Sequence, residues 1–337
     1  MKHARLVLAV LGLLMSAAAV YVLLRQISTR ELARNIAQAD PYWLIGACVL
    51  TVGGYWLRAV RWGEILSPEA KVAQGRLFAT TMVGFLAINV LPARLGELVR
   101  AYALARSERI KTGTVLGSVV IERIFDLAAL AGFWALSLLF APYPAWFRRS
   151  GYATILLSVA VTAGLWLLHA SHYDADSLAS RLRRFLPTRL TGPIEGPVAS
   201  FAAGLRVLGK PSTMAVAGVL TLAMWILTGA IFLMVGQSMG LALPLWSPLL
   251  LSFVVCVAIM VPSSPGFIGV LELSCVLGLS LLGVDRSRAT AYGVLYHLTQ
   301  IVPLVLFGGF FALRGRIGAR DPANEGEIMR SGENRKK

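Results

Sequence analysis

Charged residues are scarce in this chain of 337 residues: 15% are Asp, Glu, Lys or Arg, whereas 57% are hydrophobic. A soluble globular domain carries about 25% charged residues, so the composition excludes an ordinary soluble protein. The stretch from Pro211 to Leu271 holds no charged residue at all, although about 20 apolar residues are enough to cross a bilayer. The sequence therefore predicts an all-α polytopic membrane protein.

Cysteine pairs and enzyme motifs are lacking as well. The three cysteines, Cys48, Cys256 and Cys275, lie far apart in apolar stretches, which excludes a disulfide framework and a CxxC metal site. The sequence has no HExxH, GxSxG or Walker A motif and no DxD-type sugar-nucleotide site. Because such motifs supply a metal, a nucleophile or a phosphate-binding loop, we predict a protein without catalytic residues, metal or cofactor.

Long apolar runs predict about six transmembrane helices, over residues 6–24, 42–60, 113–140, 151–169, 213–235 and 290–312. Two further apolar segments are interrupted by proline and glycine. Proline breaks a helix, and irregular backbone at membrane depth is tolerated only where it is buried in protein or lines a wet cavity. We therefore expect two re-entrant hairpins near a site, with hinges at Asn89, Pro92, Gly96, Pro262, Pro265 and Gly266.

Basic residues indicate the orientation of these segments. With hairpins that return to their own sides, 24 of the 32 Lys and Arg residues fall on the side of both termini and 7 on the other. Positive charge accumulates in cytoplasmic loops, so we expect both termini in the cytoplasm of a bacterial inner membrane protein. The two hairpins then open to opposite faces, which is the pattern of an inverted repeat around a substrate site. No residue-level repeat is evident between the halves.

Arg94, Glu97 and Arg100 follow the first break at three-residue steps, close to one face of a helix. Two guanidinium groups beside one carboxylate leave one positive charge, which suits the capture of a phosphate with Glu97 orienting the arginines. The alternative is an interfacial salt bridge with topological anchors. We favour the phosphate site because polar groups beside a broken membrane segment are costly unless they are used.

Glu122, Arg123 and Asp126 lie about 11 to 15 residues beyond Lys111, which at 1.5 Å per residue is near the bilayer middle. Two interpretations of this trio are equally good. One is a structural ion pair between helices, and the other is a role in proton coupling or headgroup passage. Glu272 is the single charged residue from Pro211 to Leu282. Such a carboxylate needs either an arginine of the first half or a proton.

Four residues have simpler interpretations. Arg58 and Arg61 are candidates for headgroup binding, but together with Trp62 they fit interfacial anchors at the end of a span better. His297 lies in the last span, where a packing histidine is the preferred interpretation.

Together these motifs resemble the membrane domain of the lysylphosphatidylglycerol synthase family over roughly residues 5–315. The motifs that carry the resemblance are Arg58-Ala59-Val60-Arg61-Trp62, the segment from Asn89 to Arg100, Glu122-Arg123-x-x-Asp126, and the segment from Pro262 to Gly269 with Glu272. In two-part members this domain moves an aminoacylated phosphatidylglycerol to the outer leaflet after a soluble domain has made it. Stand-alone relatives also occur near polyprenyl-linked glycan and hopanoid pathways, so the resemblance does not identify the lipid that is moved.

We therefore predict a flippase-like membrane domain over residues 1–315 and a polar, disordered cytoplasmic tail over 316–337. The predicted function is movement of an anionic or aminoacylated phospholipid, or of a polyprenyl- or hopanoid-type lipid, between leaflets. The alternative is a non-transporting accessory or scaffold subunit. A separately encoded lipid-modifying enzyme and a second copy of the chain are candidate partners, whereas nucleic acid is not, because the basic residues follow the topology.

Overall fold

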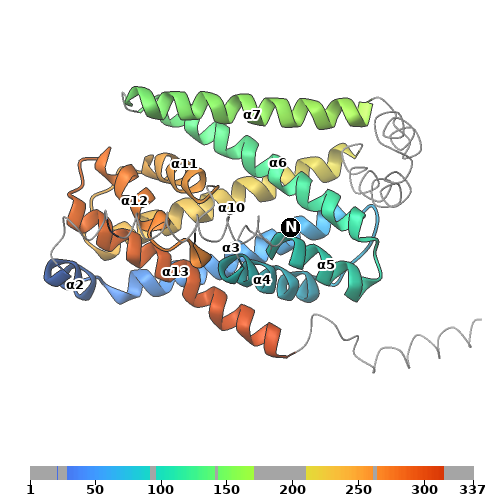
Figure 1. Ribbon diagram of the computed structural model, residues 1–337, viewed down its shortest axis with the longest axis horizontal. Helices are drawn as coiled ribbons and strands as arrows, with labels where there is room; N and C mark the ends of the chain where they lie inside the picture. Colours follow the sequence, from blue (N-terminus) through green and yellow to red (C-terminus); the bar gives the residue numbers. More distant parts are fainter. Residues whose placement is uncertain are drawn as a thin grey trace, which may run out of the picture.

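The computed structural model describes residues 21, 29–91, 96–140, 143–170, 210–260 and 264–314. All regular structure in these ranges is helical, as the sequence predicts (Figure 1). The helices are α2 (Thr29–Ala37), α3 (Pro41–Leu66), α4 (Gln74–Val90), α5 (Gly96–Glu108), α6 (Thr112–Ser137), α7 (Ala145–Ala170), α10 (Pro211–Ser238), α11 (Ser247–Met260), α12 (Val270–Ser280) and α13 (Arg286–Leu313), with a 3₁₀ turn, η3 (Pro265–Phe267), between α11 and α12.

Three helices, α3, α10 and α13, are long and apolar enough to cross a membrane. Helices α6 and α7 have 26 residues each, but α6 carries Glu122, Arg123 and Asp126. The predicted span over residues 6–24 and the predicted tail lie outside the described residues. The all-helical class is thus confirmed for the described part of the chain, whereas the number of six crossings stays a prediction.

Local sequence signals explain where the long helices begin. The Asp40 side chain accepts a hydrogen bond from the backbone N–H of Tyr42 at 2.9 Å, and proline occupies the first turn of α3. Asp285 caps α13 by accepting from the N–H groups of Ser287 and Arg288. These caps satisfy backbone donors that have no partner inside the helix, and proline at the first position loses no hydrogen bond.

The first interrupted segment forms a tight helical hairpin from α4 and α5. A Cβ atom at Gly96 would lie 2.2 Å from the backbone N of Ile88 and 2.5 Å from the backbone O of Gly84. No side chain fits at such distances, so glycine is what allows the two helices to approach. Asn89 lies at the end of α4 and Gly96 begins α5, as the sequence predicts for hinges, whereas Pro92 lies outside the described residues.

The second interrupted segment forms a hairpin from α11 and α12, and η3 lies at its break. Pro265 begins η3, and Gly266 and Gly269 have positive φ angles of 73° and 83°, a backbone conformation that favours glycine. Pro262 lies outside the described residues. The turn η3 packs against α4, so the breaks of the two hairpins meet inside the molecule.

The packing of the helices has two-fold symmetry. Exchanging α3, α4, α5 and α6 with α10, α11, α12 and α13 maps each contact between these helices onto another one. For example, α4 packs on α13 as α11 packs on α6, and α5 packs on α6 as α12 packs on α13. The most extensive contact joins α3 to α10, the pair that this exchange swaps. Each half also has its own apolar core, around Trp62 in the first and Phe232 in the second.

A residue-level repeat becomes visible once α3 and α10 are placed in the same register. Both helices begin with proline, and both carry the sequence Val-Leu-Thr with its threonine at the eleventh position, Thr51 and Thr221. Each threonine is buried and donates to the carbonyl four residues earlier, that of Ala47 or Ala217. The sequence analysis missed this repeat because the proline and the Val-Leu-Thr run are four retained positions, too few to see without a helical register.

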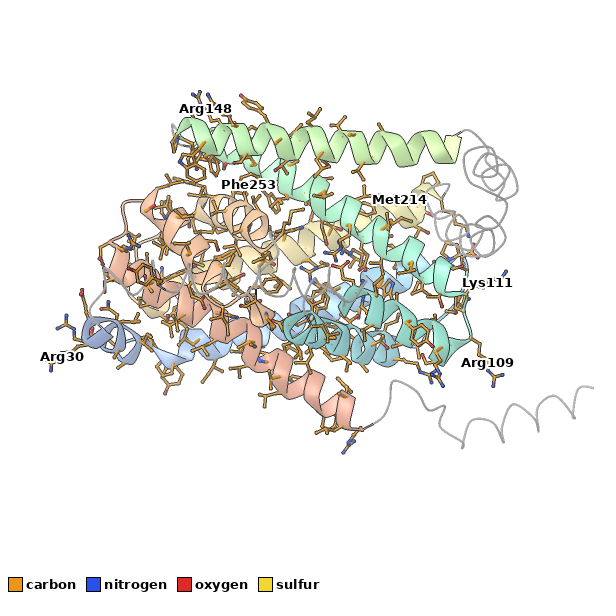
Figure 2. The ribbon with its side chains drawn as sticks, viewed as in Figure 1. Arg30, Arg109, Lys111, Arg148, Met214 and Phe253 are labelled. Carbon is orange, nitrogen blue, oxygen red and sulfur yellow. The ribbon has the colours of Figure 1, made fainter. Side chains whose placement is uncertain are left out.

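The two hairpins point toward opposite ends of the molecule. Helix α5 ends at the end where Arg109 and Lys111 are labelled, and α12 ends at the other, near Arg30 (Figures 1 and 2). Arg148 is labelled at the same end as Arg30 (Figure 2). The labelled basic residues therefore lie at two ends, separated by the lengths of α3, α10 and α13, which suits two faces of a bilayer.

Candidate functional site

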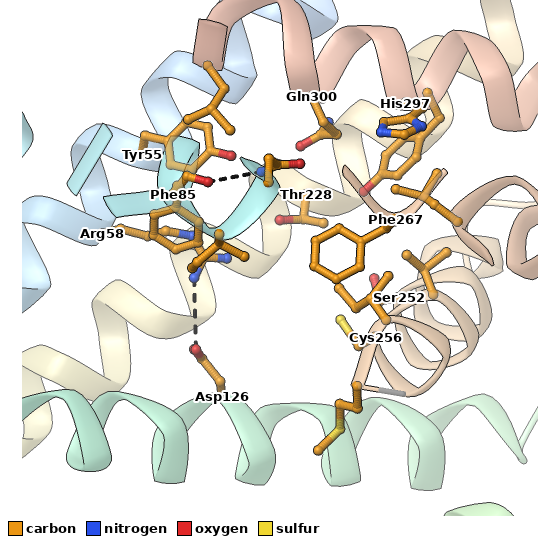
Figure 3. A pocket seen from close by; sticks show the side chains of 18 of the residues that line it. Tyr55, Arg58, Phe85, Asp126, Thr228, Ser252, Cys256, Phe267, His297 and Gln300 are labelled. Atoms are coloured by element: carbon orange, nitrogen blue, oxygen red, sulfur yellow. Dashed lines mark hydrogen bonds and ion pairs between the residues drawn. The ribbon is translucent and has the colours of Figure 1, made fainter. Parts of the chain in front are cut away.

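An internal cavity of about 460 Å³ lies between the two halves. Residues from α3, α4, α5, α6, α10, α11, α12, α13 and η3 line it, and they include Asn89 and Phe267 from the two hairpin breaks. Figure 3 shows Arg58 facing Asp126 at one side, with Phe267, His297 and Gln300 across the cavity. The broken segments thus border a cavity, and its lining is largely apolar, with further polar groups from Asn89, Glu97, Arg123, Thr228 and Ser252.

Asp126 is the centre of the charged groups at one side of the cavity. Its carboxylate accepts a hydrogen bond from Arg61 at 2.8 Å and forms ion pairs with Arg123 at 3.3 Å and Arg58 at 3.8 Å. Arg123 also pairs with Glu97 at 3.7 Å. Arg58, Glu97, Arg123 and Asp126 all line the cavity, so helices α3, α5 and α6 present an ion-paired surface there.

Behind this surface lies a second, fully enclosed part of the network. Glu122 pairs with Arg61 at 3.4 Å and with Arg100, and Arg61 donates to the hydroxyl of Thr221 on α10 at 2.8 Å. The side chains of Arg61, Glu122 and Arg100 are 0%, 1% and 2% exposed. The Arg100 guanidinium also stands over the ring of Trp62, 4.3 Å from its centroid. For Glu122 this geometry supports the interpretation as a structural ion pair that joins helices.

Counted over the described residues, this network carries one excess positive charge. It contains four arginines and three carboxylates, Arg58, Arg61, Arg100, Arg123, Glu97, Glu122 and Asp126. Within the membrane an uncompensated charge is costly, and a cavity next to it favours an anion. The Nε atom of Arg123 is buried and has no hydrogen-bond partner among the described residues.

Two pairings differ from those expected from the sequence. Glu97 pairs with Arg123, not with Arg100, and Arg100 is enclosed against Glu122 and Trp62 without lining the cavity. The spacing at three-residue steps did not reveal this, because helix α6 inserts its own charged residues beside α5. Arg94 lies outside the described residues, so its role as a phosphate ligand stays a prediction.

The interpretation of Arg61 and Trp62 as interfacial anchors is wrong. Both side chains are 0% exposed, and the indole N–H of Trp62 donates to the hydroxyl of Ser118 at 2.9 Å. Anchors would have their polar ends in water, whereas these residues contact α6. Arg58, by contrast, is partly exposed and lines the cavity.

Across the cavity, Glu272 pairs with His297. The imidazole Nδ1 lies 2.6 Å from Oε1 of Glu272, and Oε2 accepts from the backbone N–H of Gly269 at 2.6 Å. The partner is therefore a histidine and not the arginine that the sequence analysis weighed. His297 lines the cavity and contacts Glu272, so its interpretation as a packing residue missed this polar contact. The need of Glu272 for a partner could have revealed it.

The described residues contain no group of three or more His, Cys, Asp or Glu side chains that could hold a metal ion. The arginines and carboxylates that line the cavity are suited to the recognition of a charged group.

Fold and cavity together define a helical membrane protein with an ion-paired internal cavity. The chain belongs to the family described as lysylphosphatidylglycerol synthase TM region, whose family model matches residues 9–308. The resemblance inferred from the motifs is thereby confirmed. No solved structure matches the chain.

Three relatives are archaeal. The glycosyltransferase AglD of Haloferax volcanii is 24% identical over 90% of this chain, which spans only 54% of the length of AglD. A UPF0104 membrane protein of Methanocaldococcus jannaschii is 26% identical over 70% of this chain and 97% of its own length. A UPF0104 membrane protein of Methanothermobacter thermautotrophicus is 23% identical, with 88% and 91% of the two chains covered.

Proposed function

We propose that this protein moves an anionic lipid between the leaflets of the membrane, with the headgroup passing through the cavity and the acyl chains remaining in lipid. The observation that carries this proposal is the excess positive charge of the arginine and carboxylate network beside a cavity of about 460 Å³. A phosphodiester headgroup carries one negative charge and accepts the paired N–H donors of an arginine. The family is described by a lysylphosphatidylglycerol synthase, and lysylphosphatidylglycerol also presents a phosphodiester to such arginines.

In this proposal Arg58 and Arg123 bind the phosphate. Their side chains are 21% and 33% exposed and line the cavity, unlike the enclosed Arg61 and Arg100. Glu97 and Asp126 hold these arginines in place and are available to an amino group of an aminoacylated lipid. Arg94 remains a proposed ligand from its place in the sequence.

The helical symmetry supports alternating access to this cavity. Hairpins α4–α5 and α11–α12 meet at the cavity and return to opposite ends, so we propose that both are re-entrant and that they open the cavity to opposite faces in turn. The larger number of basic residues around Arg109 and Lys111 supports placing that end in the cytoplasm.

A second candidate function is that of a membrane subunit in a glycan pathway that uses a lipid carrier. AglD is named a glycosyltransferase, and this chain matches about half of its length. A polyprenyl-linked sugar also presents phosphate to a membrane protein, so the same arginines would serve either cargo. Transport of labelled phosphatidylglycerol by the isolated protein separates the first candidate from a scaffold.

Purified protein in liposomes should make fluorescent phosphatidylglycerol of the inner leaflet accessible to an impermeant quencher outside. Protein-free liposomes and liposomes with denatured protein are the controls. If the labelled phosphatidylglycerol stays in its leaflet while a labelled polyprenyl phosphate crosses, the cargo belongs to the glycan candidate. If neither crosses, the transport proposal is wrong.

Replacing Arg58 by lysine should slow lipid movement about 10-fold or more, because lysine keeps the charge but loses the two-donor fork, and a charge-assisted hydrogen bond contributes about 1.5 to 3 kcal/mol. The matched control is Arg76→Lys, since Arg76 pairs with Glu108 away from the cavity. Thermal stability should stay near wild type in both variants. Wild-type transport by Arg58→Lys would remove Arg58 from the headgroup site.

The proposed orientation predicts the reactivity of single cysteines in a background without Cys48, Cys256 and Cys275. A cysteine at Ser107 should not react with an impermeant thiol reagent in intact cells, whereas one at the exposed Ala242 should react. Both should react after permeabilisation, which controls for accessibility. The opposite pattern in intact cells would show that the topology is the inverse of the proposed one.

A further inference from the structure

Each half of the molecule holds an acid–cation pair at an equivalent position. Glu97 lies in the first turn of α5 and pairs with Arg123, the twelfth residue of α6. Glu272 lies in the first turn of α12 and pairs with His297, the twelfth residue of α13. The two-fold exchange of helices maps one pair onto the other, so the second half has histidine where the first has arginine.

This difference changes the chemistry of the second pair. An arginine keeps its proton at every physiological pH, whereas histidine is the side chain that ordinarily exchanges a proton near neutrality. The pair of Glu272 and His297 is neutral with one proton, carries one negative charge with none, and carries one positive charge with two. The pair of Glu97 and Arg123 does not change its charge in this way near neutral pH, because Arg123 stays charged.

The pair of Glu272 and His297 is accessible to protons from the cavity, and it lies at the contact between α12 and α13. His297 lines the cavity, so a proton can reach it from cavity water, while Glu272 is held by the N–H of Gly269. Helices α12 and α13 are in close contact here, since a Cβ at Gly293 would lie 2.9 Å from the Cα of Glu272. The protonation state of the pair therefore acts at the point where the second hairpin contacts α13.

The neighbouring titratable groups do not compete for this role. They are Cys275 on α12, Tyr292 and Tyr296 on α13, Cys256 on α11, and Tyr55 and Arg58 on α3. Thiols, phenols and guanidinium groups ordinarily exchange protons above neutral pH. Helix α10 contains no ionisable side chain, and Arg76 of α4 pairs with Glu108 away from the cavity. Helix α2, which carries Arg30, Glu31 and Arg34, contacts α13 through a hydrogen bond from Asn35 to Ser287. Ser287 is ten residues before His297, which is about 15 Å along α13.

We infer that Glu272 and His297 form a proton-binding site that couples proton flow to movement of the anionic headgroup. This inference rests on the proposed lipid transport. With one proton the pair is neutral and an anionic headgroup enters the cavity. Without the proton its negative charge repels that headgroup. One proton therefore enters from the water on one side, travels with the lipid phosphate and leaves on the other side, and no other bond changes.

The test is transport of fluorescent phosphatidylglycerol in proteoliposomes with an imposed pH gradient. Wild-type protein should accumulate the label several-fold in the leaflet on the alkaline side, and a protonophore should abolish the accumulation. Label that equilibrates equally with and without the gradient would overturn the coupling while leaving lipid transport intact. Label that never crosses would instead contradict the proposed function, so the two failures are distinct.

Three variants separate coupling from a structural role. His297→Asn keeps a hydrogen-bond donor toward Glu272, and Glu272→Gln keeps an acceptor for the N–H of Gly269. Glu272→Gln removes the negative charge and should equilibrate the label with no response to the gradient. His297→Asn leaves the negative charge of Glu272 in place and should slow the crossing, again with no response to the gradient. His297→Arg reproduces the pair of the first half and should lose the response as well, while folding normally. A gradient response of wild-type size in His297→Asn would overturn the assignment.

A measurement on the protein alone tests proton binding without transport. In nuclear magnetic resonance of protein with labelled histidine, the signal lost in His297→Asn identifies His297, and this signal should respond to added protons. Glu272→Gln should alter that response. A signal of His297 that does not respond to added protons would overturn the proton site whatever the lipid assay shows.

Discussion

Glu122→Ala is expected to destabilise the protein by about 3 to 5 kcal/mol, the cost of leaving a buried charge without its partner. Arg100 has Glu122 as its acidic partner, and Arg61 shares Glu122 with Asp126. The side chains of Arg61, Arg100 and Glu122 are at most 2% exposed, so water cannot replace the lost carboxylate. The measurement is the free energy of unfolding in detergent micelles.

The matched control is Glu108→Ala, which removes the partly exposed ion pair with Arg76. Such pairs contribute about 0 to 1 kcal/mol, so this variant should unfold near the wild-type midpoint. The double variant Glu122→Ala with Arg100→Met removes both charges and should recover much of the loss. Equal stability of Glu122→Ala and Glu108→Ala would contradict the buried network.

Gly96→Ala is expected to cost about 3 kcal/mol, at the upper end for overpacking. The added Cβ would lie 2.2 Å from a backbone nitrogen of Ile88 and 2.5 Å from the backbone oxygen of Gly84. Backbone of α4 cannot move aside as a side-chain end does, so the α4–α5 hairpin must open. Because Glu97 is the next residue, its distance to Arg123 should increase and lipid movement should fall with stability.

Gly132→Ala is the matched control for this effect. It lies within α6, and nothing lies within 4 Å of an added Cβ there. Alanine is favoured over glycine in a helix by about 1 kcal/mol, so this variant should be as stable as wild type or more stable. Comparable losses in both variants would mean that α4 and α5 do not approach closely at Gly96.

The all-helical class and the breaks of both hairpins could be predicted because their causes are local. Proline and glycine change the backbone at their own positions, and the described hinges Asn89, Gly96, Pro265 and Gly266 lie at helix ends or between helices. The charge asymmetry likewise depends on counting alone. Family membership followed from motifs whose order and spacing are visible in the chain.

The partners of the charged residues could not be predicted, because they depend on the rotation of each helix about its axis. A soluble helix reveals its buried face by its apolar stripe, whereas α6 is apolar on most sides and shows no such stripe. The sequence therefore placed Arg61 at an interface, although Glu122 and Asp126 enclose it. For the same reason, the sequence did not show that His297 faces Glu272, although the need of Glu272 for a partner pointed to a polar group nearby.

The network of four arginines and three carboxylates also bears on the order in which the helices insert during biosynthesis. Its charged residues lie between positions 58 and 126, and Thr221 is the one described hydrogen-bond partner that is made later. A charged residue at a helix centre costs about 2.5 to 3.5 kcal/mol on insertion from the translocon, which opposes the entry of α6 by itself. Because the ribosome delivers α3 and α5 with their arginines first, we expect α6 to insert together with them and not as an independent span.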